Sequence, residues 1–132
     1  MNINLAINQG SKILSKMFIS NPQLDSELLM AKIIKKDRNY ILLNSNKYLN
    51  RDDLKNFYSL IKQRSLGKPI AYLTNKKNFW NSDFYITNDT LIPRPETELI
   101  VENVLSLTKQ KNKINILDIG VGSGCILLSI LK

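Results

Sequence analysis

Histidine is absent from this sequence of 132 residues, and cysteine occurs once, as Cys125. Zinc and copper sites in proteins are built mainly from these two residue types, so we expect no metal site. A single cysteine also excludes an internal disulfide. Nothing in the cysteine content therefore points to an oxidising compartment.

Long apolar runs are missing as well. No run approaches the roughly 20 residues that a membrane-spanning helix needs. The first five residues lack the basic and apolar regions of a secretory signal. Hydrophobic residues make up 43% of the chain and charged residues 23%, the balance of a folded domain rather than a disordered one. We therefore expect a cytoplasmic protein with no membrane partner.

Positive charge is concentrated in the first half of the chain. Residues 1–75 hold twelve Lys/Arg against five Asp/Glu, whereas residues 76–132 hold seven against six. A basic domain attracts acidic partners such as RNA, a ribosome or an acidic protein face. The alternative is that lysine only solvates the surface of this domain.

The first half has the periodicity of helices. Apolar residues recur at helical spacing in residues 3–18, although Gly10 is a weak point there. Asn21-Pro22 is typical of a helix start, with Asp25 and Glu27 near the positive end of that helix. Two more helices are predicted, a short one at Tyr40–Leu43 and one from Asn50 to Gly67. These segments predict a small helical bundle.

Short aromatic and β-branched runs follow Gly67-Lys68-Pro69, and they predict a β-hairpin. The runs are Ile70–Leu73, Phe79-Trp80 and Phe84–Thr87, with Asn81-Ser82 as the candidate turn. We expect Trp80 and Phe84 to belong to the core of the hairpin rather than to a substrate platform.

The last third predicts a helix, a strand and a second helix. Pro95 opens the first helix, which continues to about Thr108. Ile114–Ile119 is an apolar run of strand length, and Cys125–Leu131 begins the next helix. Cys125 itself is expected to be a small buried packing residue.

The glycine-rich segment between that strand and helix carries the clearest chemical signal. It reads Asp118-Ile119-Gly120-Val121-Gly122-Ser123-Gly124. Glycines there permit a sharp turn and close approach of a ligand to the backbone, at the edge where α/β sheets bind ligands. Dinucleotide enzymes need glycine at position 125, which is cysteine, and the Gly-Lys-Ser/Thr of a P-loop is absent. The pattern is instead that of the first motif of methyltransferases that bind S-adenosylmethionine (SAM).

Three segments in this order closely resemble the HemK/PrmC family of protein-(glutamine-N5) methyltransferases, which modify peptide chain release factors. They are the run from Gln63 to Leu73 with Phe79-Trp80 and Phe84, the run from Leu91 to Glu98, and the run from Ile116 to Ile126. One local departure is Asn75, where the family often has glycine. The resemblance implies methyl transfer from SAM to the glutamine of the Gly-Gly-Gln motif in class 1 release factors.

The resemblance also implies roles for particular residues. The turn under the cofactor would be formed by Gly120, Val121, Gly122, Ser123 and Gly124, with Asp118 ordering the turn or contacting SAM. A pocket-lining segment would be Arg94, Pro95, Glu96, Thr97 and Glu98. The alternative for Arg94, Glu96 and Glu98 is that they only cap and solvate a helix start. In the family an Asn-Pro-Pro-Tyr motif orients the glutamine amide, and this motif is not found in residues 1–132.

The predicted fold class is therefore α+β to α/β, in three parts. Residues 1–68 form a helical substrate-recognition domain, residues 69–90 a β-hairpin linker, and residues 91–132 the beginning of a Rossmann-type methyltransferase domain. One strand and part of one helix do not complete a parallel sheet. We therefore expect the chain alone to be inactive, with no catalytic residue of its own and weak or absent SAM binding. Two alternatives stay open, a non-catalytic basic module that docks on a release factor or ribosome, and a fragment of a dinucleotide-binding oxidoreductase.

Overall fold

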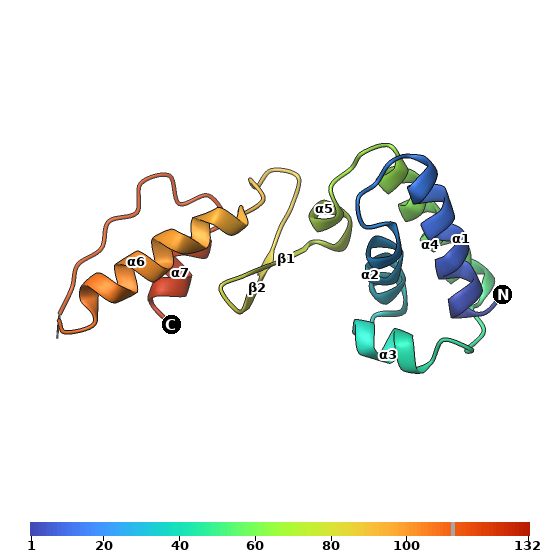
Figure 1. Ribbon diagram of the computed structural model, residues 1–132, viewed down its shortest axis with the longest axis horizontal. Coiled ribbons are helices and arrows are strands. Elements are labelled where there is room, and N and C mark those ends of the chain that lie inside the picture. The colour runs from blue at the N-terminus through green and yellow to red at the C-terminus, as the bar shows by residue number, and fades with distance from the viewer. Residues whose placement is uncertain (112) are drawn as a thin grey trace. The chain divides into compact units, whose positions relative to one another are not determined.

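The protein divides into two compact units, Met1–Thr74 and Asn75–Lys132, in a computed structural model that describes residues 1–111 and 113–132 (Figure 1). Each unit has its own cluster of buried apolar side chains. In the described part of the chain, no helix is long and apolar enough to cross a membrane.

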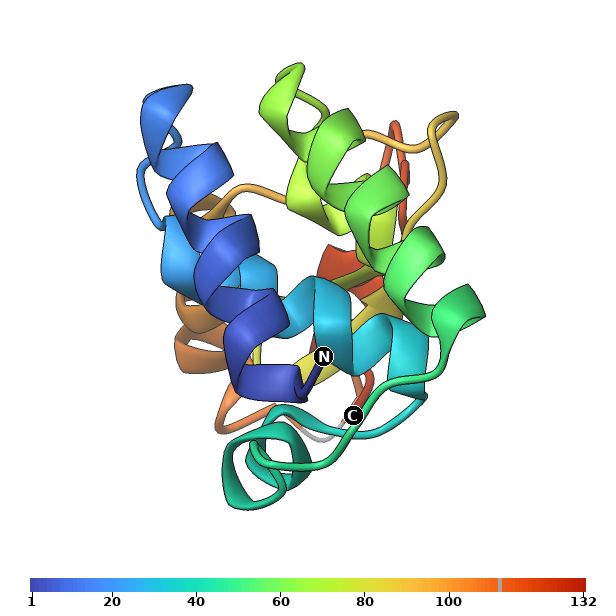
Figure 2. The same ribbon diagram turned by 90° about the vertical axis from the view of Figure 1, so that its right-hand side faces the viewer.

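The first unit is the predicted helical bundle (Figures 1 and 2). Its helices are α1 (Ile3–Lys16), α2 (Pro22–Ile34), α3 (Arg38–Leu43), α4 (Arg51–Ser65) and α5 (Ile70–Thr74). Side chains cap three of the helix starts. The backbone N–H of Leu5, Tyr40 and Asp53 each donates to the side chain three residues earlier, that of Asn2, Asp37 and Asn50. Asn21 stands at the cap position of α2, as predicted, but its side chain makes no capping bond.

Helix α5 corrects the prediction of extended structure at Ile70–Leu73. Pro69 fixes a backbone angle suited to a helix start. Its carbonyl accepts bonds from the N–H of Tyr72 (3.1 Å) and of Leu73 (3.3 Å). Ala71 and Leu73 are then buried, 4% and 5% exposed. Burial of this face outweighs the β propensity of the isolated run.

Gly10 lies where α1 packs against α2 and α4. A β-carbon at this position would stand 2.9 Å from both Ile61 Cδ1 and Phe57 Cζ, and 3.0 Å from Ser26 Oγ. These distances are shorter than ordinary packing permits. The residue that weakens α1 as an isolated helix is therefore the one that lets three helices share a core.

Helix α2 carries two buried carboxylates that are paired with arginines from other helices. Asp25 Oδ2 accepts from Nε of Arg64 at 2.6 Å, and Glu27 Oε2 accepts from Nε of Arg38 at 2.6 Å. Both acidic residues are 5% exposed. A position near the positive end of α2 was expected for these acids. The structure adds that their charges are compensated across helices.

The second unit begins with the predicted hairpin. Strand β1 (Lys76–Phe79) pairs antiparallel with β2 (Ser82–Tyr85), and Phe79 faces Ser82 across the ladder. The turn is therefore Trp80-Asn81, one residue earlier than predicted. Both residues have positive φ, 47° and 58°, which matches the twist of a two-residue hairpin.

Side-chain contacts link the two strands of the hairpin and its open end. Lys76 Nζ lies 2.7 Å from Asp83 Oδ2, and this hydrogen bond lowers the pKa of the Asp83 carboxyl. Asn75 has a φ of 57° and donates through Nδ2 to the carbonyl of Ile86. Asparagine tolerates this left-handed conformation better than most residues. The departure from glycine at position 75 is thus accommodated.

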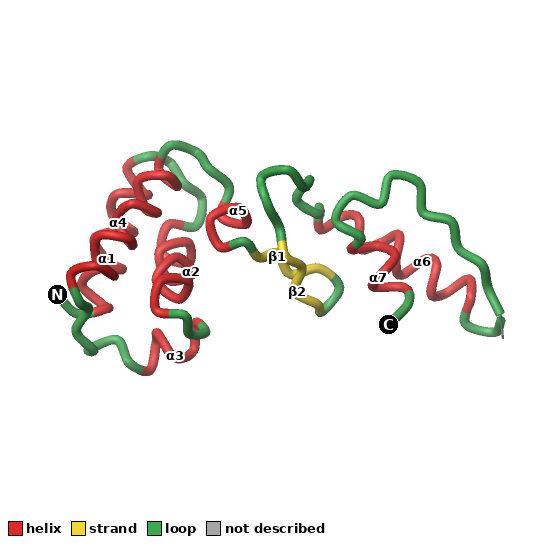
Figure 3. Tube along the Cα trace, turned by 180° about the vertical axis from the view of Figure 1, so that it is seen from behind, coloured by secondary structure: helices red, strands yellow, loops and turns green. Residues whose placement is uncertain are grey.

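Helices in the C-terminal part follow the prediction, but the strand does not. The 3₁₀ turn η1 (Pro95–Thr97) leads into α6 (Glu98–Thr108), and α7 covers Cys125–Ile130. The strand predicted over Ile114–Ile119 is not formed, since residues 113–118 have no regular secondary structure (Figure 3). A strand is held by ladder bonds to a neighbour. In the described residues the only sheet is the β1–β2 pair.

Replacing Gly10 with alanine is expected to lower the free energy of unfolding by about 1 kcal/mol. The free-energy cost of packing the new methyl group into the crossing exceeds the free energy that alanine contributes through its higher helix propensity. Urea unfolding followed by far-ultraviolet circular dichroism measures the change. Ser15→Ala, at an exposed position of the same helix, is the matched control and should be neutral or stabilising. A Gly10→Ala protein as stable as its parent would contradict the account of the crossing.

Arg64→Leu is expected to destabilise the protein by about 3 kcal/mol, because it leaves a buried carboxylate without its charge partner. The double variant Arg64→Leu, Asp25→Leu should recover at least half of that loss, since it removes both charges. The same urea titration compares the two variants. A double variant less stable than Arg64→Leu alone would show that the unpaired Asp25 carboxylate is not the cause of the lost stability.

Amide hydrogen exchange is expected to be fast from Ile114 to Ile119 in this chain and slow across the middle of α1. The first segment has no ladder bonds among the described residues, whereas α1 is packed in the core. Mass spectrometry of exchanged peptides measures both. Strong protection across Ile114–Ile119 would contradict the unpaired state of this segment.

Candidate functional site

Three glycines shape the turn that follows Ile119. Gly120, Gly122 and Gly124 have φ values of 83°, 54° and 73°, all in the left-handed region that residues with a side chain rarely adopt. A β-carbon on Gly120 would meet nothing within 4 Å, and one on Gly122 would meet only a backbone oxygen at 3.7 Å. The glycines thus serve the backbone conformation and leave open space beside it.

The turn leads directly into α7. The N–H of Gly124 donates to the carbonyl of Val121 at 2.8 Å, and the Gly124 carbonyl accepts from the N–H of Leu128 at 2.9 Å. Ser123 Oγ lies 3.4 Å from the N–H of Cys125, which donates to it. Val121 is 47% exposed. All five residues predicted for the cofactor turn are therefore contiguous in one closed turn at a helix start.

Asp118 precedes this turn and has an unusual environment. Its Oδ2 atom is shielded from solvent and has no hydrogen-bond partner in the part of the chain that the structure describes. A buried acceptor without a donor costs about 1–3 kcal/mol. Such an atom is suited to a ligand that brings a hydroxyl or an ammonium donor.

The segment from Arg94 to Glu98 is exposed in its first part and partly buried in its second. Arg94, Pro95 and Glu96 are exposed, and Thr97 and Glu98 are half-buried. The Arg94 carbonyl accepts from the N–H of Thr97 at 3.1 Å, which closes η1. Glu98 Oε1 accepts from the N–H of Trp80 at 3.0 Å. Glu98 therefore holds the strained hairpin turn, and the exposed part of the segment is the part available for contacts.

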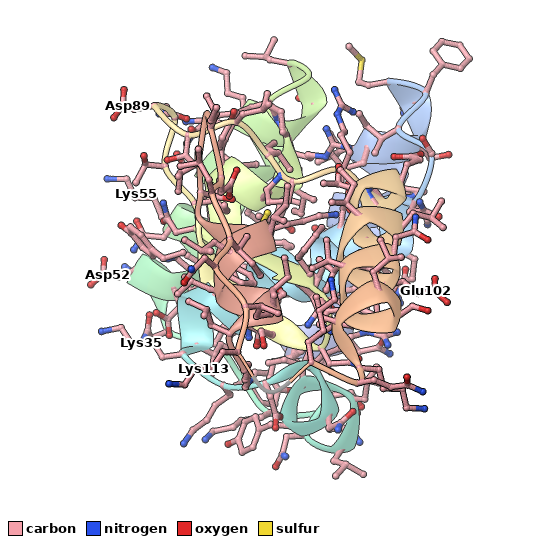
Figure 4. All side chains as sticks on the ribbon, turned by 90° about the vertical axis from the view of Figure 1, so that its left-hand side faces the viewer. Lys35, Asp52, Lys55, Asp89, Glu102 and Lys113 are labelled. Carbon is pink, nitrogen blue, oxygen red and sulfur yellow. The ribbon has the colours of Figure 1, made fainter. Side chains whose placement is uncertain are left out.

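An apolar cluster joins the elements that carry these segments. Its buried members are Phe79, Val101 and Cys125, from β1, α6 and α7. Trp80 and Phe84 pack against it, so the expectation that these aromatics are hairpin core is confirmed, as is the burial of Cys125. Figure 4 shows Glu102 of α6 pointing away from the helix into solvent, next in sequence to the buried Val101.

These features fit donor groups of SAM. The cofactor carries an ammonium group on its amino-acid moiety and two hydroxyls on its ribose, and Asp118 offers an acceptor that lacks a donor. The open glycine turn permits close approach to the backbone. The residues present are therefore compatible with the predicted cofactor.

Sequence reasoning missed a shallow depression on the helical unit. Its volume is about 390 Å³, and it is lined by Lys32, Ile33 and Lys35 of α2, Asp53, Asn56, Ser59 and Leu60 of α4, and Leu73 of α5. Figure 4 shows Lys35, Asp52 and Lys55 pointing outward from this part of the unit. Lys32 Nζ donates to the carbonyl of Thr74 at 3.3 Å. No spacing in the sequence brings these lining residues together, because the helices that carry them are joined only by tertiary packing.

A comparison with known protein families identifies the helical unit. The profile of the PrmC N-terminal domain matches residues 6–74, slightly more than half of the chain. This range coincides closely with the first compact unit, Met1–Thr74.

Curated relatives match almost the whole chain. A release factor glutamine methyltransferase of Buchnera aphidicola subsp. Schizaphis graminum is 39% identical over 98% of this chain and 46% of its own length. Proteins of the same name from Coxiella burnetii and Leptospira interrogans are 37% and 38% identical, over 96% and 94% of this chain. The chain spans about half the length of the curated relatives it matches. By the domain match and these relatives, this protein belongs to the PrmC family of release factor glutamine methyltransferases.

Proposed function

We propose that the whole protein carrying this chain methylates the glutamine side-chain nitrogen of the Gly-Gly-Gln motif in class 1 release factors, with SAM as methyl donor. Family membership supports the reaction class. The single observation that carries the cofactor assignment is the glycine turn at 120–124 beside the orphan carboxylate oxygen of Asp118.

In this proposal, residues 91–132 belong to a Rossmann-type domain, and Asp118 with residues 120–124 hold the cofactor. Bound SAM supplies an electrophilic methyl group. The Asp118 carboxylate would accept hydrogen bonds from donor groups of the cofactor, and the open turn at Gly120 and Gly122 would let the backbone lie close to it. Arg94, Pro95, Glu96 and Thr97 border the pocket, and Glu98 fixes the border to the hairpin through Trp80.

Positioning dominates the chemistry that this reaction needs. An amide nitrogen is a weak nucleophile, since its lone pair is delocalised into the carbonyl. Holding donor and acceptor in line is then worth more than acid–base catalysis. A turn whose three glycines adopt left-handed conformations lets the backbone lie close to one reactant and so helps to hold it in place.

The predicted helical domain at residues 1–68, which lies within the helical unit Met1–Thr74, is proposed to recognise the protein substrate, with residues 69–90 as the linker. Its twelve Lys/Arg against five Asp/Glu favour an acidic partner surface. This charge also supports a second candidate, a basic module that docks on a release factor or on ribosomal RNA without chemistry. Transfer of labelled methyl groups to a release factor separates the two, because a docking module transfers none.

Gly122→Ala in the whole protein is expected to weaken SAM binding about tenfold. A side chain at this left-handed position costs about 1–2 kcal/mol and displaces the turn. Isothermal titration calorimetry with SAM measures the affinity, and labelled methyl transfer should fall with it. Gly67→Ala is the matched control. Gly67 has a φ of 92° and open space around it, but it lies in the helical unit. Equal SAM affinity of the Gly122→Ala protein and its parent would contradict the cofactor assignment.

A further inference from the structure

Exposed apolar side chains gather at one end of the helical bundle. Figures 1 and 2 show the C-terminal ends of α1 and α4 at this end and α3 at the other end. The Arg64–Asp25 pair ties the last turn of α4 to the first turn of α2. We refer to four exposed residues here as the apolar tip: Met17 (52%), Phe18 (96%), Leu24 (40%) and Leu66 (76%).

Phe18 occupies a left-handed backbone position at which the fold does not require a phenylalanine. The N–H of Ile19 donates to the carbonyl of Leu14 at 3.2 Å, and that of Phe18 to Ser15 at 3.1 Å. This pair of bonds is the Schellman motif, in which the residue at the Phe18 position is left-handed and usually glycine. Phe18 has a φ of 56° and is 96% exposed. The fold would gain from glycine here, and the aromatic ring contributes almost nothing to the core.

Charge around the apolar tip has one sign. Lys12 and Lys16 stand in the last turns of α1, and Lys62 and Lys68 flank the end of α4. Within residues 1–36 and 54–74 the only acids are Asp25 and Glu27. Both are 5% exposed, and each is paired with an arginine. The remaining acids of the unit, Asp37, Asp52 and Asp53, lie at the starts of α3 and α4.

We propose that the apolar tip is the surface through which the helical unit docks on its protein partner, and that the partner offers an apolar pocket framed by Asp and Glu. An aromatic or Met centre with a charged rim is the anatomy of a protein–protein interface. A nucleic-acid surface would instead show exposed arginines and several stacking aromatics. The inference rests on the proposed function, under which the docked partner is a release factor.

Strain at Phe18 supports this reading. Exposed aromatic rings in left-handed conformations are unfavourable for stability, and such positions are concentrated where function requires them. A large exposed apolar side chain on a monomer marks an interaction site when neighbours extend it into a patch. Met17, Leu24 and Leu66 provide that extension from three different segments.

Phe18→Gly tests the proposal, because it separates binding from folding. The 132-residue chain is titrated against a recombinant class 1 release factor of the source organism by biolayer interferometry. We expect binding roughly 30-fold weaker for Phe18→Gly, the loss typical of a central aromatic anchor. The melting temperature should stay unchanged or rise by about 4 °C, because glycine relieves the left-handed strain. A loss of affinity together with unaltered or higher stability excludes misfolding as its cause.

Leu43→Ala is the matched control. Leu43 is 86% exposed but belongs to α3 at the opposite end of the bundle, so its removal should leave the affinity unchanged. Equal affinity of Phe18→Gly and the parent, or an equal loss in Leu43→Ala, would overturn the apolar tip while leaving the methyl-transfer proposal intact. If the chain instead co-sediments with phosphatidylserine vesicles in a way that requires Phe18, and does not bind the release factor, the surface is a lipid-binding one. That result would also overturn the proposal. No binding by the parent chain would overturn both the tip and the docking role of the helical unit.

Discussion

Close approach of α1 to α2 and α4 at Gly10 fixes the arrangement of the helical unit. Because no side chain stands at this position, Phe57, Ile61 and Ser26 occupy the space beside the α1 backbone. The same packing brings α2 between arginines of α3 and α4, so its two carboxylates are buried and compensated. With those acids withdrawn from the surface, the charged side chains exposed at the end of the bundle near Phe18 are lysines. The packing at Gly10 thus helps to fix the arrangement of the helices that carry these ion pairs and the apolar tip.

In the second unit the corresponding constraint is backbone conformation. Three glycines in the left-handed region leave open space beside the turn, and Asp118 presents an acceptor without a donor. Glu98 and the Phe79–Val101–Cys125 cluster connect the hairpin to α6 and α7. Residues of this unit therefore divide into those that hold it together and those left without such a contact. Glu98, Trp80 and Cys125 belong to the first group, and Asp118 with the glycine turn belongs to the second.

Local signals in the sequence were sufficient for most helices and for the sharp glycine turn at 120–124, while tertiary contacts were not predictable. Asn50, Pro95 and Gly67 mark helix ends by chemistry that acts within a few residues, and each prediction is confirmed. Ile70–Leu73 and Ile114–Ile119 have β-type composition, but the first is buried as a helix and the second pairs with no strand among the described residues. The pairing of Asp25 with Arg64 joins residues far apart in sequence, so no spacing rule reveals it. Gly10 was expected only to weaken α1, since its packing role depends on two other helices.

The most direct test of the assignment is the methylation state of the release factor in source cells with and without the gene for this protein. Mass spectrometry of the release-factor peptide that contains the Gly-Gly-Gln motif measures whether its glutamine is methylated. The account predicts a methylated glutamine in the parent cells and an unmodified one in the deletion strain, with recovery when the gene is returned. Methylation that persists in the deletion strain would contradict the proposed function.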